Sequence, residues 1–192
     1  MREIEILVEV FEKKEDALKI LGGFNFVGMK NIIDTYFYDP LRNDFKPDKN
    51  GRLKKCLRIR EKDRMGYLTY KFDHFDHNNT WIYSDEHELK ISDLDTATKI
   101  LSDIGMEILV KIENKKYTFT SDKYEIVLED VKDLGLFMEV EYLNPPTDAN
   151  VDHLKEEIRK FIKTLHIKTS EELNAGKPEL ALKKKNIGLL KL

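Results

Sequence analysis

The sequence has little of several features that would assign a protein class at once. A single cysteine, Cys56, excludes an internal disulfide framework and fits a reducing compartment. There is no apolar run long enough to span a bilayer, and the chain begins in a strand-like pattern rather than a secretory signal. Neither sign of charge is in large excess, because the net charge is −3 although 36% of the residues are charged. We therefore expect a cytoplasmic protein without nucleic-acid or membrane partners.

The sequence also lacks an internal repeat of fixed period and any low-complexity segment. With 192 residues it is most simply one domain over 1–192, long enough to bury a core. We expect the core over about 1–165, followed by a lysine-rich C-terminal tail over 166–192. The tail is predicted to form a short helix and a loosely held end.

The chain opens on a strand in which apolar and acidic side chains alternate. Successive side chains of a strand point to opposite faces. In the segment 3–10 one face carries Ile4, Ile6, Val8 and Val10, and the other carries Glu3, Glu5, Leu7 and Glu9. The segment 135–142 repeats the pattern, because Glu139 and Glu141 share a face with Phe137. A single strand of this kind usually exposes its glutamates to water, but neighbouring carboxylates repel each other and their recurrence points to a function.

Most of the remaining chain is predicted to form strands with a few helices between them. Strands are expected over 31–39, 56–61, 67–72, 81–91, 107–120 and 123–130, and helices over about 13–21 and 151–165. A further helix should begin at Ser92-Asp93-Leu94-Asp95, which resembles a capping box. It should end near 104, because Gly105 marks a stop. About eight strands in hairpin-like succession indicate an antiparallel sheet.

Charged residues lie opposite apolar ones on many of these strands. Arg58 and Arg60 share one face, and so do Glu86 and Glu88. An open sheet could expose all of them to water. A closed barrel with a polar interior and an apolar exterior under helices fits the pattern equally well. Such a tunnel would suit a metal-bound polyanion, with carboxylates on the cation and basic groups on the phosphate oxygens.

Two loops carry weaker signals. His74 and His77 have a His-x-x-His spacing with flanking aspartates, which could bind a metal, but a polar loop of this kind is more often a plain turn. The segment 40–52 is locally basic and contains Pro47, so it is more simply a solvated loop or hairpin tip than a phosphate-facing lip.

Six motifs taken together resemble the CYTH family, the triphosphate tunnel metalloenzymes. In chain order they are Glu3-Ile4-Glu5, Asp34-Thr35-Tyr36-Phe37, Leu57-Arg58-Ile59-Arg60, the strand that carries Lys71, Glu86-His87-Glu88, and Leu134-Gly135-Leu136-Phe137-Met138-Glu139-Val140-Glu141. Each motif is weak alone, but their order and approximate spacing over about 1–165 resemble those of the family. The family includes class IV adenylyl cyclases, thiamine triphosphatases and inorganic triphosphatases.

The resemblance implies an α+β fold, an eight-stranded antiparallel β tunnel (barrel) with helices packed outside. It also implies a metal-dependent triphosphatase, monomer or homodimer, that binds a triphosphate-containing small molecule with Mg²⁺ or Mn²⁺. The implied metal-binding residues are Glu3, Glu5, Glu129, Glu139 and Glu141. The implied substrate-binding residues are Arg58, Arg60, Lys71 and Lys116, and the implied catalytic residues are Glu3, Glu5 and Lys71. Lys116 aligns best with the family's arginine position on the strand over 107–120. Lys115, whose side chain would point to the opposite face, is the alternative.

The chain departs from the family pattern at three positions. The opening motif normally ends in a lysine where this chain has Leu7, an arginine is common in place of Ser84, and a lysine is usual in place of Asn114. Each departure removes a positive group that would stabilise charge developing in a transition state. If Leu7 faces the tunnel, Leu7→Lys is predicted to strengthen triphosphate binding. If Leu7 is instead packed under a C-terminal segment that closes one end of the tunnel, the same change buries an ammonium and is predicted to destabilise the fold.

Three functions are therefore open. The first is hydrolysis of an inorganic, thiamine or nucleoside triphosphate, which needs only the charged cage and is preferred. The second is a class IV-type adenylyl cyclase that makes cyclic AMP and pyrophosphate. The third is a degenerate tunnel that binds a nucleotide or polyphosphate without turnover, as the missing lysine at Leu7 suggests.

Overall fold

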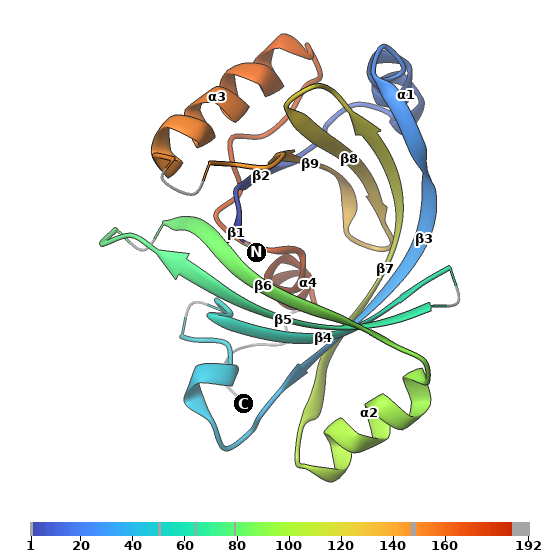
Figure 1. The fold of residues 1–192 in the computed structure, drawn as a ribbon, viewed down its shortest axis with the longest axis vertical. Coiled ribbons are helices and arrows are strands. Elements are labelled where there is room, and N and C mark those ends of the chain that lie inside the picture. Colours follow the sequence, from blue (N-terminus) through green and yellow to red (C-terminus); the bar gives the residue numbers. More distant parts are fainter. Residues whose placement is uncertain (1, 50, 64, 79, 147–148, 186–192) are drawn as a thin grey trace.

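In a computed structural model of the chain, the described residues are 2–49, 51–63, 65–78, 80–146 and 149–185. They form one antiparallel sheet with helices around it (Figure 1). The strands are β1 (Arg2–Glu3), β2 (Glu5–Glu9), β3 (Asn25–Tyr38), β4 (Lys55–Lys62), β5 (Met65–Phe75), β6 (Trp81–Ile91), β7 (Glu107–Thr120), β8 (Tyr124–Val131) and β9 (Gly135–Tyr142). The helices are α1 (Lys14–Leu21), α2 (Leu94–Asp103), α3 (Val151–Thr164) and α4 (Lys177–Lys184), and a short 3-10 helix spans Asn43–Phe45.

The first strand closes the sheet into a tunnel. Among the described residues the strand order is β1-β6-β5-β4-β3-β7-β8-β9-β2. β1 and β2 are separated by Ile4 alone, yet they pair with opposite ends of the sheet: Glu3 lies opposite Ser84 of β6, and Glu5 lies opposite Glu141 of β9 (Figure 1). Counted as one interrupted strand, they complete the eight-stranded antiparallel tunnel. The expected fold is confirmed, and the open sheet is excluded.

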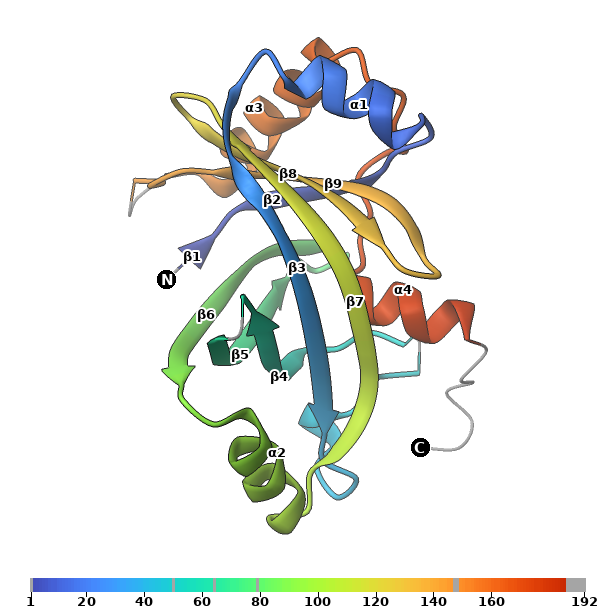
Figure 2. The same cartoon turned by 90° about the vertical axis from the view of Figure 1, so that its right-hand side faces the viewer.

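Apolar layers cover the outside of the tunnel. Ile4 and Ile6 point outward and are almost completely buried in one cluster with Ile158 of α3. Figure 2 shows α1 and α3 together over β2, β8 and β9. At the other end of the molecule, Leu101 of α2 packs in a second cluster with Ile59 of β4. Because helices cover the apolar side of the strands, the alternate side chains point into the tunnel.

Side-chain caps set where two of these helices begin. The Asp93 carboxylate accepts a hydrogen bond from the Thr96 N–H at 2.9 Å, so the cap of α2 is Asp93 and not Ser92, one residue later than the expected capping box. Asn150 caps α3 in the same way, accepting from the His153 N–H at 3.1 Å. Each cap satisfies one N–H that has no partner inside the helix.

Two strands are longer than the sequence predicted. β3 begins at Asn25 rather than at the predicted residue 31. Its additional residues form backbone hydrogen bonds with β7 as far as Thr120. β5 continues to Phe75, so His74 lies in a strand rather than in the expected turn. Its Nε2 lies 2.8 Å from Asp85 Oδ2 on β6, and this contact accounts for the histidine without a metal.

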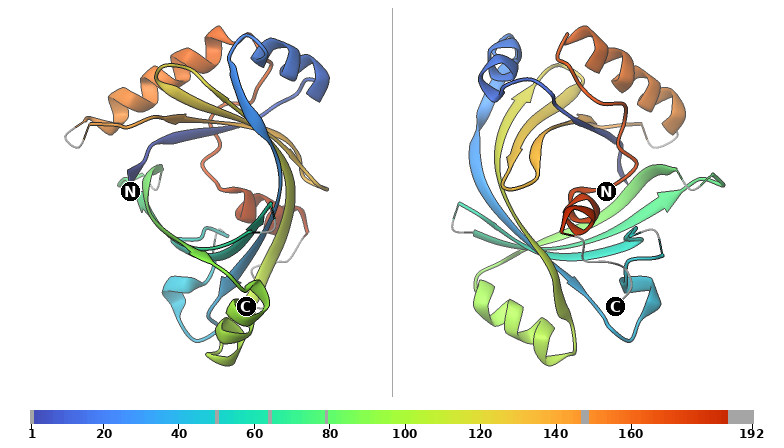
Figure 3. Two further views of the ribbon diagram at one scale, coloured as in Figure 1. Left: turned by 45° about the vertical axis from the view of Figure 1, so that its right-hand side comes forward. Right: turned by 180° about the vertical axis from the view of Figure 1, so that it is seen from behind.

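The C-terminal segment contains the expected short helix, α4, and the described part of the tail is packed against the tunnel. α4 lies at one end of the tunnel and is seen nearly end-on in the right-hand view of Figure 3. Its Leu182 is buried in an apolar cluster with Leu7, and its Glu179 carboxylate accepts a hydrogen bond from the Leu53 N–H at 2.7 Å. The part of the tail over 186–192 lies outside the described residues. No helix within the described ranges has the length and apolar character needed to cross a membrane.

Candidate active site in the tunnel

The tunnel contains a cavity of about 360 Å³ with many charged side chains in its wall. Strand register explains their gathering, because residues paired across neighbouring strands share a face: Arg58 lies opposite Thr69, and Lys71 opposite Glu86. The predicted site residues in the wall of this cavity are Glu3, Glu5, Arg58, Arg60, Lys71, Lys116, Glu139 and Glu141. Only Glu129 of the predicted set is not among its lining residues.

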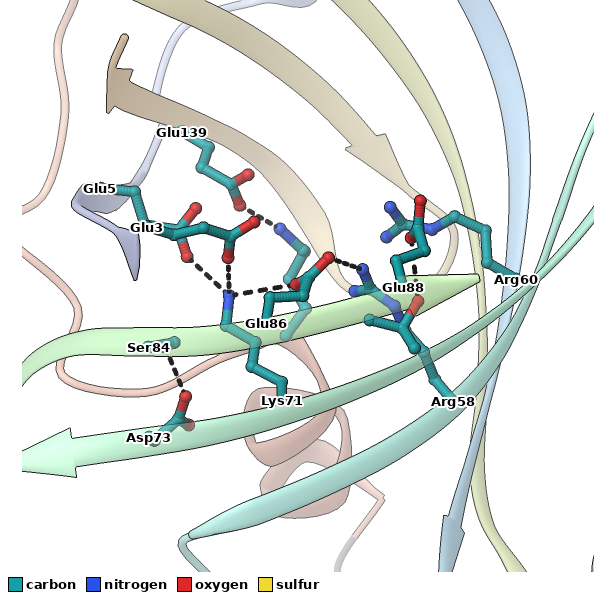
Figure 4. A network of polar contacts seen from close by, with 12 residues as sticks. Glu3, Glu5, Arg58, Arg60, Lys71, Asp73, Ser84, Glu86, Glu88 and Glu139 are labelled. Carbon is teal, nitrogen blue, oxygen red and sulfur yellow. Dashed lines mark hydrogen bonds and ion pairs between the residues drawn. The ribbon is translucent and has the colours of Figure 1, made fainter. Parts of the chain in front are cut away.

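Lys71 binds the carboxylates of the first strand. Its Nζ lies 2.8 Å from Glu3 Oε2, 3.2 Å from Glu5 Oε1 and 3.9 Å from Glu86 Oε2 (Figure 4). Burial disfavours the ammonium, but the carboxylates of Glu5, Glu3 and Glu86 raise the pKa of Lys71 well above its usual value. Lys71 is therefore a permanent cation where the acidic and basic parts of the wall meet.

One part of the acidic wall lacks such compensation. Glu141 lies opposite Glu5 on β2 and opposite Glu125 on β8. Burial, followed by the charge of Glu139, raises the pKa of Glu5 to about 7. Burial, followed by the charges of Glu5 and Glu3, raises the pKa of Glu141 to about 8. Carboxylates perturbed in this way attract a cation. As they lie, no three His, Cys, Asp or Glu side chains of the described residues converge to hold a metal ion.

Lys177, which the sequence analysis missed, enters the tunnel from the first position of α4. Its Nζ lies 2.9 Å from Glu129 Oε1 and 2.6 Å from Glu139 Oε2. Burial alone would raise the pKa of Glu139, but the ammonium groups of Lys177 and Lys116 lower it well below its usual value. The local signal was only the Gly-Lys-Pro break around Lys177, and nothing in it indicates that the chain returns to the tunnel.

Glu129 is completely buried and anchors basic residues instead of lining the cavity. Lys116 Nζ lies 3.0 Å from Glu129 Oε1, and Asn114 Nδ2 donates to Glu129 Oε2 at 3.1 Å. Together with Lys177, these groups engage both oxygens of the carboxylate. Asn114, at a position where the family pattern has lysine, thus still contributes a donor to the acidic cluster.

The register of β7 decides between the two candidate lysines. Lys116 pairs with Glu129 across the β7–β8 ladder and lines the cavity. Lys115 pairs with Asp130, one residue along, and therefore has the opposite orientation. The preferred residue, Lys116, is the one inside the tunnel.

Arg58 and Arg60 form the basic wall. Arg60 donates from Nε and Nη2 to the two oxygens of Asp34 at 2.7 and 2.9 Å. Burial opposes ionisation of Asp34, but the guanidinium groups of Arg60 and Arg58 hold its pKa well below its usual range. Arg58 Nη2 lies 3.6 Å from Glu86 Oε1, while its buried Nε has no hydrogen-bond partner within the described residues.

Leu7 combines the two placements that the sequence left open. It lines the cavity opposite Glu139 in the β2–β9 ladder. It also packs under the C-terminal segment, because its carbonyl accepts a hydrogen bond from the Leu173 N–H at 2.8 Å and its side chain is buried with Leu182. An apolar side chain here suits the closed end of the tunnel.

The wall as a whole can bind an anion on one side and a cation on the other. Arg58, Arg60 and Lys71 are positive, and among the described residues Glu141 has no basic residue in an ion pair although several carboxylates surround it. Cys56 also lines the cavity, but burial raises its pKa so far that it stays a thiol and is not a nucleophile. The site can therefore act through charged side chains held in fixed positions, and not through a cysteine nucleophile.

Comparisons with known proteins match this geometry. Residues 1–175 match the CYTH domain. A Methanocaldococcus jannaschii protein named a putative adenylate cyclase is 31% identical over 170 residues, which are 87% of this chain and 91% of that protein. A solved structure from Pyrococcus horikoshii has a TM-score of 0.75 at 23% identity, covering 94% of this chain and 99% of that one. A putative adenylyl cyclase from Hippeastrum, described as having a dominant triphosphatase activity, has a TM-score of 0.61 at 16% identity over 95% of each chain.

Proposed function

The chain belongs to the CYTH domain family, and from that membership we propose that it binds a triphosphate compound with Mg²⁺ or Mn²⁺ in the tunnel and hydrolyses it. The observation that carries the proposal is one cavity with a basic wall around Arg58 and Arg60 and an acidic wall around Glu5 and Glu141. A polyanion that carries a divalent cation satisfies both walls at once.

The donor chemistry of the acidic wall fits Mg²⁺ or Mn²⁺, which prefer carboxylate oxygens. The raised pKa values of Glu5 and Glu141 mark buried carboxylates crowded by other carboxylates; Glu5 shares Lys71 with Glu3, and Glu141 forms no ion pair with a described basic residue. We assign the metal to Glu3, Glu5, Glu139 and Glu141. Glu129, already held by two lysines, is assigned the positioning of those lysines. A bound cation supplies Lewis-acid polarisation of a phosphoryl oxygen.

The chain's own cations bind and orient the phosphates. Arg58 and Arg60 donate to phosphate oxygens from one side, and Lys71 and Lys116 reach them from others. Charge that develops on the oxygens of the terminal phosphoryl group meets donors that are already in place, so little reorganisation is needed. Lys71 also fixes the Glu3 carboxylate, which is our candidate for orienting the attacking water.

A second candidate function is cyclisation of ATP, favoured by the name of the Methanocaldococcus jannaschii relative. The attacking group would then be the ribose hydroxyl of the substrate, and the products would be cyclic AMP and pyrophosphate. Hydrolysis is preferred because it needs only the charged cage. Binding without turnover is less favoured, because Lys177 brings an ammonium to Glu139 although position 7 carries Leu7.

One assay distinguishes these functions. Purified protein is incubated with tripolyphosphate, ATP and thiamine triphosphate, each with Mg²⁺ and with Mn²⁺, and orthophosphate, pyrophosphate and cyclic AMP are measured. We expect metal-dependent release of orthophosphate from at least one substrate. Glu139→Gln and Glu141→Gln should each lower turnover by at least about 100-fold, because Gln keeps the shape of the side chain and removes its charge.

The matched control is Glu61→Gln, an exposed glutamate of β4 whose orientation is opposite to that of Arg60. It should leave turnover unchanged. Cyclic AMP and pyrophosphate from ATP, without orthophosphate, would assign the cyclase instead. Wild-type turnover and metal affinity in both tunnel variants would show that the metal assignment is wrong.

A further inference from the structure

The basic face of β4 extends beyond the two arginines. Arg58, Arg60 and Lys62 alternate along this strand, and all of them line the cavity. The chain enters β4 from Leu53, whose N–H donates to Glu179 of α4, and runs away from the closed end of the tunnel. With a rise of about 3.3 Å per residue, Lys62 lies about 13 Å along the strand from Arg58. The row of cations therefore reaches toward the end opposite α4.

Lys30 of β3 joins Lys62 at that end and also lines the cavity. Lys62 pairs with Ile32, which lies two residues along β3 from Lys30 on the same face. Burial, followed by the charges of Lys30 and Arg60, lowers the pKa of Lys62, and the carboxylate of Glu88 offsets this only in part. Two like charges that disfavour each other in this way attract an anion.

The other cations of the tunnel have a close carboxylate partner. Arg60 lies 2.7 Å from Asp34, and Lys116 lies 3.0 Å from Glu129. Within the described residues, the ion-pair partner of Lys30 is the half-exposed Asp63, at 3.7 Å. Lys62 forms no ion pair with a carboxylate of the described part of the chain. The charge of Lys62 acts on the carboxylate of Glu125, which lines the same cavity, but no close ion pair joins the two side chains. The ammonium of Lys62 therefore remains available to a ligand.

We propose that Lys30 and Lys62 form an outer subsite for one further phosphate, so that the tunnel binds linear phosphate chains longer than a triphosphate. The inference rests on the proposed function, which places the inner phosphates between Arg58, Lys71 and Lys116. The next phosphate along β4 then meets Lys62. Lysine suits this position because an ammonium binds phosphate as a point charge without requiring a bidentate geometry. The further phosphate belongs either to an inorganic chain or to a nucleoside tetraphosphate.

Binding without metal tests the subsite independently of turnover. Isothermal titration calorimetry in EDTA compares tripolyphosphate with tetrapolyphosphate, and ATP with adenosine tetraphosphate. We expect the fourth phosphate to tighten binding by about fivefold in at least one pair, the effect of a partly exposed ion pair. Lys62→Met and Lys30→Met should each remove this gain. Lys111→Met, which changes an exposed lysine facing away from the tunnel on β7, should retain it.

Each outcome has a distinct meaning. A gain in the inorganic pair alone identifies polyphosphate as the source, and a gain in the adenosine pair alone identifies nucleoside tetraphosphates. Equal binding within both pairs, no binding of any of the four compounds, or a gain that persists in both lysine variants overturns the outer subsite. Absence of hydrolysis would refute the proposed triphosphatase and leave this binding comparison valid. Thermal melts should be near wild type, since both lysines are only partly buried.

Discussion

The Asp34 carboxylate has 1% of its surface exposed, and its two oxygens accept hydrogen bonds from a single guanidinium, that of Arg60. A buried pair of this kind adds little over an apolar pair, but loss of one partner leaves an uncompensated buried charge. Arg60 is thus oriented before any ligand binds. Lys71, between Glu3 and Glu5, is oriented in the same way. Both side chains lose less conformational freedom on binding phosphate than free ones would.

Arg60→Met is expected to lower the free energy of unfolding by about 3–5 kcal/mol, because the Asp34 carboxylate loses its bidentate partner inside the protein. Adding Asp34→Asn should recover most of this loss, since a neutral amide needs no cation. Urea denaturation of the two single variants and the double variant measures the coupling. Losses that simply add would contradict the assignment of a stabilising role to this pair.

At the scale of whole elements, α4 supplies a cation that the first strand does not. Leu7 lies opposite Glu139 in the β2–β9 ladder, so a lysine there would be close to this carboxylate. In this chain Lys177 of α4 reaches Glu139 instead, while Leu7 is buried with Leu182 of the same helix. The apolar residue at position 7 of β2 is therefore compatible with a charged Glu139 because α4 supplies the basic residue. The expectation that Leu7→Lys strengthens binding changes accordingly.

Leu7→Lys is now expected to destabilise the protein, because it places an ammonium among apolar side chains under α4. Lys177→Met should destabilise it as well, because Glu139 and the fully buried Glu129 lose a cation. The double variant should be more stable than the sum predicts by at least about 1 kcal/mol, since the new lysine can approach Glu139.

Denaturant unfolding of the four proteins in this cycle measures the coupling between β2 and α4. Lys132→Met is the control, because Lys132 pairs with Glu113 at the surface and its loss should change stability by no more than about 0.5 kcal/mol. Strict additivity of the two tunnel substitutions would show that position 7 cannot replace the cation of α4.

Across the whole molecule, stability depends on the protonation of the tunnel. The pKa values of Glu5, about 7, and Glu141, about 8, lie above the usual 4.5. Burial likewise raises the pKa of Glu179 at the closed end to about 7. Between the usual and the raised values the folded protein binds more protons than the unfolded chain, so stability falls as pH rises.

The Tm of the metal-free protein is therefore expected to fall between about pH 5 and about pH 8. Mg²⁺ or Mn²⁺ should restore much of the loss at the upper end, because a cation at Glu5 and Glu141 replaces the protons lost there. Glu141→Gln should flatten the metal-free profile and weaken the effect of metal. Differential scanning calorimetry across this pH range measures both effects, and a Tm that rises steadily without metal would contradict the assignment.

The sequence alone was sufficient to predict which side chains share a face of each strand, although Glu129 of the predicted set does not line the cavity. Alternation along a strand is a local property, so Glu3 and Glu5 were separated from Ile4 and Ile6 without knowledge of the fold. Lys116 and Lys115 have opposite parity, but the register of β7 was needed to show which of them lines the cavity. Strand ends were predicted less well, since β3 and β5 extend along their partner strands further than their own residues indicate.

Only the tertiary structure decided which charges meet. The alternating pattern fitted an open sheet as well as a barrel, and closure depends on β1 and β2 joining opposite ends of one sheet. Lys177 reaches Glu139 from 38 residues away in the chain, and no local pattern announces that contact. Burial and neighbours shift the pKa of Glu5 upward and that of Glu139 downward, although the two residues are chemically identical. Coulomb interactions depend on distance and on burial, and both are set by the packing of the whole chain.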